Sequence, residues 1–244
     1  MLNFAHEKIY RSKRMEQTIY IIALVLTGLF NLALGGIIFV GNKAYRKQTA
    51  YLRARLLTIL WLVSFGLGYI IHALFLWRYT WPTAASALTV SFFHIGAICF
   101  NWGYIPLLNP NYLTKGVIVR DLIVFVAGLT SYWMVALLWH HAPTYVCLAF
   151  SVFFAYSAVT VFKFYRTYNR VSLRMIRMSS GNVMEFIRWM QVCCDCIVLF
   201  GIGSVAITAI FPNDIIPFVM LLTSGAGMFA YIAYSITKYG KNIT

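Results

Sequence analysis

Seven long apolar runs divide this sequence and leave little other material from which to build a fold. They cover residues 17–40, 55–77, 83–106, 119–139, 143–162, 191–212 and 215–237. Each approaches the roughly 20 residues that a helix needs to cross the hydrocarbon core of a bilayer. Because backbone polar groups in lipid must be satisfied internally, such runs predict helices. We therefore predict an all-α, polytopic membrane protein with seven transmembrane helices, forming a single domain over residues 1–244.

The composition supports a membrane protein and argues against a soluble one. The chain is 61% hydrophobic and only 11% charged, whereas soluble domains carry roughly 25% charged residues. Its net charge of +14 is also found in nucleic-acid-binding proteins. Here, however, the charges are confined to short segments between the apolar runs, where they determine membrane topology. We therefore expect no nucleic-acid partner.

The distribution of Lys and Arg predicts the orientation of the chain. Of the 20 such residues, five lie in segment 41–55, two in 107–120, six in 163–190 and two in 238–244. These segments alternate with the short connections and therefore lie on one side. Only Arg78 and four residues before the first run fall on the other side. The positive-inside rule then places the N-terminus outside and the C-terminus in the cytoplasm.

The longest connection, 163–190, is expected to form a basic cytoplasmic helical hairpin. It contains no Gly or Pro before residue 181, and Asn182 stands three residues before Glu185, the spacing of a capping box that opens a second helix. Steps of three and four residues place five cations on one helix face: Lys163, Arg166, Arg170, Arg174 and Arg177. Two interpretations of this stripe stay open, namely attraction to anionic lipid head groups and docking of a cytoplasmic protein partner.

Polar side chains inside the bilayer are costly, so each is a candidate site. Asp195 lies about one turn inside the sixth run, and Cys99 and Asn101 lie at a similar depth in the third. We hypothesise a hydrogen bond between Asn101 and Asp195. Such a bond serves either as a structural clamp between helices or as part of a polar path.

Histidines raise the question of a metal or haem site. His72 and His94 suggest bis-imidazole haem ligation, but they differ by about 9 Å in expected depth, at about 1.5 Å per residue. His72, His140 and His141 all fall in the outer half, where three His can bind zinc. Adjacent residues of a helix do not face one site, so an outer pH-sensitive or ligand-contacting patch is the alternative. We predict no metal and no cofactor.

One part of the chain resembles known proteins. The stretches "ARLLTILWLVSFGLGYIIHALFLWR" and "WPTAASALTVSFFHIGAICFNWGYIPLLNPNYLTKGVIVRDL" lie within residues 51–122. They resemble small seven-helix inner-membrane proteins of Bacteroidota, and the membrane input region of membrane-bound AraC-type helix-turn-helix regulators. The resemblance implies a bacterial inner membrane and a stand-alone sensor-like domain. Because only six residues follow Lys238, we expect no DNA-binding output domain.

Three functions remain as alternatives. The first is a non-enzymatic, sensor-like or accessory signalling protein that senses a lipid, quinone-like or other apolar ligand and docks a partner through the basic hairpin. The second is a small transporter or channel with a polar path at Asp195 and Asn101. The third is a haem-binding redox protein using His72 or His94. The sequence also leaves open homo-oligomerisation.

Overall fold

The computed structural model describes residues 2–138, 143–178, 184–210 and 215–243, and every element within them is helical. The elements are α1 (Leu2–Val40), η1 (Gly41–Tyr45), α2 (Thr49–Phe75), α3 (Trp77–Thr80), α4 (Pro82–Leu108), α5 (Lys115–Leu138), α6 (Pro143–Met178), α7 (Met184–Ile210) and α8 (Ile215–Ile243). Among the described residues, seven helices are long and apolar enough to cross a membrane. The all-α class and the seven candidate spans are therefore confirmed.

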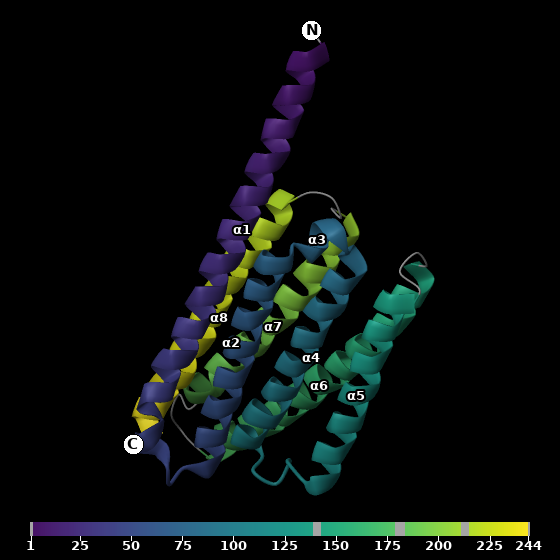
Figure 1. Ribbon diagram of the computed structural model, residues 1–244. Coiled ribbons are helices and arrows are strands. Elements are labelled where there is room, and N and C mark those ends of the chain that lie inside the picture. The colour runs from purple at the N-terminus through teal and green to yellow at the C-terminus, as the bar shows by residue number, and fades with distance from the viewer. Residues whose placement is uncertain (1, 139–142, 179–183, 211–214, 244) are drawn as a thin grey trace.

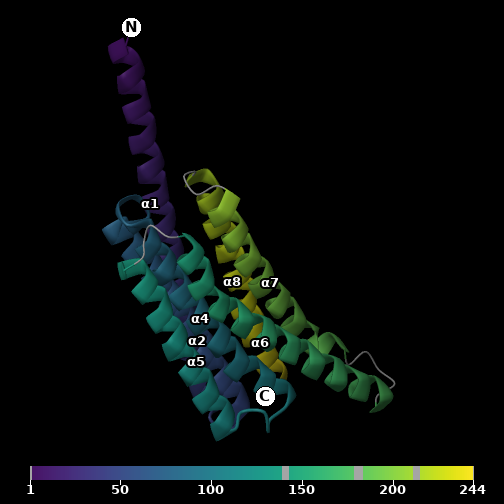
Figure 2. The same cartoon turned by 90° about the vertical axis from the view of Figure 1, so that its right-hand side faces the viewer.

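The long helices form one bundle with the two chain ends at opposite ends of it (Figure 1). Helix α1 packs along α2 and α8, and its first turns extend beyond the other helices. Helix α4 lies at the centre, in contact with α2, α5 and α6. Helix α7 packs on α8, and the ends of α6 and α7 near residue 180 lean away from the rest of the bundle (Figure 2).

The second span begins earlier than predicted, at Thr49 rather than residue 55. Arg55 is consequently not a loop cation, since its side chain is 1% exposed. Its Nε donates to Asn42 at 2.7 Å, one terminal nitrogen donates to the Tyr51 hydroxyl at 3.0 Å, and the other to the carbonyl oxygen of Ile38. Near the C-terminus of α1, unpaired helix carbonyls attract a cation. This position makes the burial of Arg55 tolerable.

Helices α1 and α2 approach closely because both carry a glycine at their crossing. A Cβ at Gly28 would lie 3.0 Å from the carbonyl oxygen of Gly66, and one at Gly66 would lie 2.9 Å from that of Gly28. Small residues allow membrane helices to make such contacts. Helix α8 carries a stretch of small residues at 224–227. The closest approach there is at Gly225, where a Cβ would meet the ring of Phe200 on α7 at 2.4 Å.

Helix α6 runs unbroken from the bundle interior to Met178, as the sequence predicts. Phe164, Tyr168 and Ser172 are buried on one face of its second half. The four arginines of the stripe are exposed, and Lys163 is partly buried. The predicted turn at 179–181 and the capping residue Asn182 lie outside the described residues.

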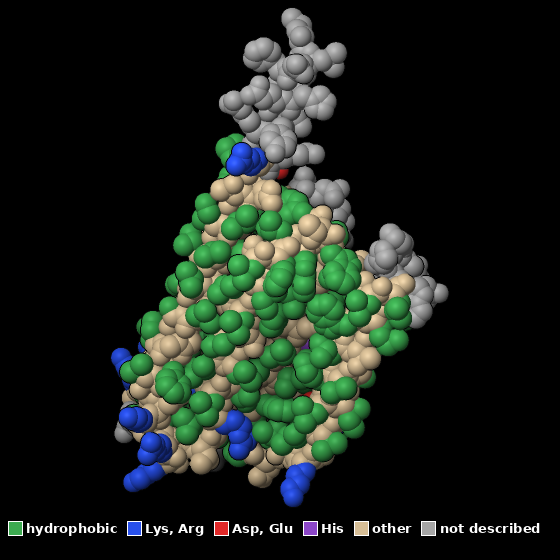
Figure 3. Space-filling view, viewed as in Figure 1, with side chains coloured by type: hydrophobic (Ala, Val, Ile, Leu, Met, Phe, Trp, Pro, Cys, Tyr) green, Lys and Arg blue, Asp and Glu red, His purple; other side chains and the backbone are tan. Residues whose placement is uncertain are grey.

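The surface divides along the bundle axis. Figure 3 shows hydrophobic side chains covering the middle of the visible face, while Lys and Arg side chains gather at the lower end. The C-terminus lies at this same end (Figure 1). The described surface thus has the two-zone character of a protein embedded in lipid.

Candidate functional site

The first candidate site is a hydrogen-bonded group near the end of α4, the start of α5 and the first half of α6. The chain positions it through the start of α5, where the Thr114 hydroxyl accepts a bond from the Val117 amide at 3.4 Å. A Thr that caps a helix in this way fixes where the first turn begins. The next turns of α5 then carry Arg120 and Asp121 toward α4.

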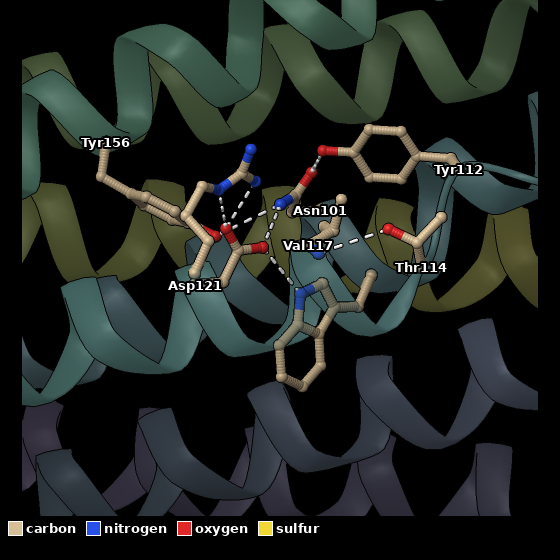
Figure 4. A network of polar contacts seen from close by, with 8 residues as sticks. Asn101, Tyr112, Thr114, Val117, Asp121 and Tyr156 are labelled. Carbon is tan, nitrogen blue, oxygen red and sulfur yellow. Dashed lines mark hydrogen bonds and ion pairs between the residues drawn. The ribbon is translucent and has the colours of Figure 1, made fainter.

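Asp121 is the centre of this group, because its carboxylate is fully buried and accepts four hydrogen bonds. Asn101 Nδ2 and Trp102 Nε1 each donate to Oδ2 at 2.8 Å, and Arg120 donates to Oδ1 at 2.9 and 2.6 Å (Figure 4). Asn101 also donates to the Tyr156 hydroxyl at 3.2 Å and accepts from the Tyr112 hydroxyl at 2.8 Å. We call these residues the Asp121 cluster; its members are Asn101, Trp102, Tyr112, Arg120, Asp121 and Tyr156.

The Asp121 cluster binds three helices and the loop before α5 to one another. A buried carboxylate is strongly unfavourable unless it is paired and hydrogen-bonded, and here both conditions hold. The Arg120 side chain is 44% exposed, so the cation reaches the surface while the anion does not. With its acceptors occupied by protein donors, this arrangement is suited to holding helices together.

The polar residues predicted from the sequence fall into separate places. Asn101 belongs to the Asp121 cluster, but the hypothesised bond to Asp195 is wrong. Asp195 is partly buried and instead accepts a hydrogen bond from the Tyr165 hydroxyl, which joins α7 to α6. Cys99 is 3% exposed and lies in the main apolar core. A polar path joining Asp195 to Asn101 therefore lacks the contact on which it depends.

The histidines are also separate. His72 bonds Thr89 at 3.1 Å through Nε2, and His94 bonds the Tyr132 hydroxyl at 3.1 Å through Nδ1. His140 and His141 lie outside the described residues. Within the described ranges, no three His, Cys, Asp or Glu side chains are grouped closely enough to hold a metal ion.

The second candidate site is a cavity of about 500 Å³ between α2, α4, α6 and α7. We call it the aromatic cavity, because rings from all four helices line it. These are Trp61, Phe65, Phe93, Phe100, Phe153, Phe154 and Phe200. Phe154 and Ile202 line the cavity with 42% and 62% of their surfaces exposed, so the cavity is reached from the outer surface of the bundle.

Small residues lie between large ones on the helices that line this space. On α4, Gly96 and Ala97 lie between two phenylalanines, and on α6, Ser157 and Ala158 lie between Phe154 and Val161. The Trp61 ring occupies the place beside Gly96, where a Cβ would lie 2.6 Å from its Nε1. Gly201 on α7 widens the cavity, because a Cβ there would meet nothing within 4 Å.

The two sites meet at one turn of α6. The Tyr156 hydroxyl interacts with Asp121 and with the hydroxyl of Thr160, and Thr160 lines the aromatic cavity. The sequence analysis missed Asp121, Tyr156 and the cavity. A signal for the cavity is present in the spacing Phe93, Gly96, Ala97, Phe100, which puts small residues between aromatic ones on one helix face.

Comparisons with protein-family models, with curated proteins and with solved structures found no match to this chain.

Proposed function

We propose that this protein is a non-enzymatic, sensor-like protein of a bacterial inner membrane that binds an apolar, membrane-dissolved molecule in the aromatic cavity. The observation that carries the proposal is the cavity itself. Its volume of about 500 Å³ falls within the roughly 300–1,000 Å³ typical of small-molecule sites. Its lining is aromatic and aliphatic, and its border faces lipid, so an apolar molecule enters without crossing water.

The orientation that we propose has the N-terminus outside and the C-terminus in the cytoplasm. Its support is the gathering of Lys and Arg at the end of the bundle that carries the C-terminus (Figures 1 and 3), together with the positive-inside rule. Accessible cysteines at Lys47 and Arg170, in a background without native cysteines, are expected to react from the cytoplasmic side. A cysteine at Tyr79 is expected to react from the outside.

The output that we propose is the basic stripe on α6. The same continuous helix lines the cavity with residues 153–161 and carries the stripe with residues 163–177. A ligand that wedges α6 away from α7 therefore tilts the stripe as part of one rigid element. The exposed arginines then contact an acidic cytoplasmic protein, with anionic lipid head groups as competing partners.

A photolabelling experiment tests whether the cavity takes up apolar molecules. Membranes containing the protein are equilibrated with an aryl diazirine, irradiated and digested, and the labelled residues are mapped by mass spectrometry. We expect label on Trp61 and Ala97, which face the cavity and not the lipid. Gly201→Leu fills the space and removes this label, whereas Gly227→Leu, at an exposed α8 position equally free of contacts, leaves it unchanged. Equal labelling in the two variants contradicts the proposal.

The output has its own test. Pull-down of a cytoplasmic protein by the intact membrane protein is expected to be lost when Arg166, Arg170 and Arg174 become Gln. Lys43, Arg46 and Lys47 supply the matched control, since they are basic residues at the same end of the bundle on another element. Loss of capture in both triple variants indicates general charge attraction and contradicts a specific docking stripe.

A further inference from the structure

The aromatic cavity contains one polar group whose position restricts what it binds. Ser157 lines the cavity, and its hydroxyl is buried without a hydrogen-bond partner among the described residues. Ser64 and Ser91 each donate to the carbonyl oxygen four residues earlier, both at 2.7 Å, as is usual for Ser inside a helix. The hydroxyls of Ser157, Ser172 and Thr83 are buried without a partner among the described residues. Of these three, Ser157 is the one that lines the cavity.

The surroundings of Ser157 limit which molecules can bond to it. Ser157 lies within the candidate span of α6 and borders a space lined mostly by apolar side chains. A hydrogen-bonding group that reaches it must therefore belong to a molecule that is otherwise apolar. An acyl chain that enters the cavity has nothing to accept the bond that Ser157 can donate.

The walls of the cavity favour a planar, conjugated ligand. Phe65 and Phe93 stack with an interplanar angle of 15° and centroids 5.3 Å apart, while Trp61 meets Phe65 edge to face. Aromatic faces and edges interact best with another flat π-system in offset or edge-to-face geometry. A ligand that satisfies both the walls and Ser157 is therefore flat, apolar enough to dissolve in the bilayer, and carries a hydrogen-bond acceptor on its ring.

From the position of Ser157 and the aromatic walls, we infer that the aromatic cavity binds the head group of an isoprenoid quinone, with Ser157 donating to a ring carbonyl. The inference rests on the proposed function and names its ligand class. Rotation about the Cα–Cβ bond of Ser157 moves the hydroxyl between staggered positions and presents it to the ligand. The isoprenoid tail leaves between α6 and α7, past Phe154 and Ile202, into the lipid.

Binding of the head group can also change the contacts of the Asp121 cluster through Thr160 and Tyr156. Thr160 lies one helical turn after Ser157, lines the same cavity and interacts with Tyr156. Tyr156 in turn accepts a bond from Asn101, which accepts one from Tyr112 in the loop before α5. A ligand carbonyl that takes the Thr160 hydroxyl away from Tyr156 therefore disturbs a chain of contacts that ends at the lower surface of the bundle.

Competition between two matched molecules tests the inference. The full-length protein in membranes is photolabelled with the aryl diazirine in the presence of 2,3-dimethyl-1,4-naphthoquinone or of 2,3-dimethylnaphthalene, a flat hydrocarbon of the same carbon skeleton with aromatic C–H groups in place of the two carbonyls. Concentrations are expressed per lipid, so that partitioning cancels. We expect the quinone to protect Trp61 and Ala97 at about three- to tenfold lower membrane concentration, the gain that one neutral hydrogen bond gives.

Two serine variants test whether the tighter binding of the quinone depends on the Ser157 hydroxyl. Ser157→Ala is expected to narrow the difference between the two competitors, whereas Ser151→Ala, at an exposed position outside the cavity on the same helix, preserves the full difference. If both competitors protect equally in the unmodified protein, the quinone inference is overturned while an apolar-ligand site stands. If neither protects, or if the label does not reach the cavity, both the inference and the proposed function are overturned.

Discussion

The Asp121 cluster and the aromatic cavity are built on the same helices, α4 and α6, yet they treat polar atoms in opposite ways. In the cluster, a fully buried carboxylate accepts four hydrogen bonds. In the cavity, the free hydroxyl of Ser157, the residue after Tyr156 on α6, adjoins open space lined by rings. The first site is complete by itself, and we propose that the second is completed by a ligand.

The difference shows how a ligand site can be recognised in a bundle of apolar helices. A buried polar group is costly in lipid, so a group whose hydrogen bonds are all made within the protein is accounted for as a contact that holds helices together. A buried polar group with no partner, beside unfilled volume, indicates a missing component. The polarity of a residue alone does not distinguish these two cases, but its bonding does.

The largest effect on stability is expected from a substitution in the Asp121 cluster. Asp121→Ala leaves the donors of Asn101 and Trp102 without their shared acceptor, and each buried donor left unsatisfied costs about 1–3 kcal/mol, while the Arg120 side chain is exposed enough to be hydrated. We therefore expect a large fall in the free energy of unfolding, measured by denaturant titration in detergent micelles. Asp195→Ala is the control, since its carboxylate is partly buried and bonds Tyr165 alone among the described residues. Similar losses in both variants would contradict the central position of Asp121.

Substitutions at two glycines, Gly128 and Gly225, compare the cost of adding a methyl group in closely packed surroundings with its cost beside the cavity. A Cβ at Gly128 would lie 2.7 Å from the Tyr132 hydroxyl and 3.1 Å from His94, whereas one at Gly225 would lie 2.4 Å from Phe200. Phe200 has the aromatic cavity on its other side, so its ring can shift, while Tyr132 is held by His94. We expect Gly128→Ala to cost about 1–3 kcal/mol and Gly225→Ala clearly less. The contact distances alone predict the reverse order, so thermal unfolding of the two variants decides which argument holds.

A smaller effect is expected where the two sites meet. Tyr156→Phe removes the acceptor for Asn101 and the contact with Thr160 but keeps the ring, so we expect a loss of about 1 kcal/mol. In the same variant the Thr160 hydroxyl is released toward the cavity, so protection by the naphthoquinone is expected to increase. Tyr112→Phe removes a bond of 2.8 Å on the other side of Asn101 and is expected to change stability without changing that protection.

The sequence was sufficient to predict the helices because apolar length is a local property. Four of the seven predicted starts lie within four residues of a helix start, and five of the seven predicted ends lie within two residues of a helix end. The early start of α2 is explained by Arg55, whose partners Ile38 and Asn42 belong to the preceding segment. The unbroken course of α6 through the basic stripe was predictable for the same local reason, since no helix breaker stands in it.

The sites were not predictable, because they depend on how the helices are rotated about their axes. Asp121 stands next to an arginine near a helix start and looks like a surface residue; only its contacts with Asn101 and Tyr156, from two other helices, explain its burial. Asp195 is more central in its apolar run, yet its burial is lower. The cavity forms where faces of four helices meet with their small residues opposite one another. The sequence of one apolar run does not show how its helix is rotated against the other three.

The smallest expected effect on stability concerns the basic stripe, and it separates function from folding. Arg166 and Arg170 are exposed and make no hydrogen bond or ion pair with the described residues, whereas Phe164 and Tyr168 on the opposite face are buried. Exposed substitutions of this kind typically move the melting temperature by less than about 2 °C, so we expect the double change to Gln to leave unfolding and quinone protection unchanged. If it lowers stability as much as Tyr156→Phe, the stripe is part of the fold and its proposed role as an output is contradicted. If only partner capture changes, ligand binding in the upper half of α6 and docking in its lower half are separable properties of one helix.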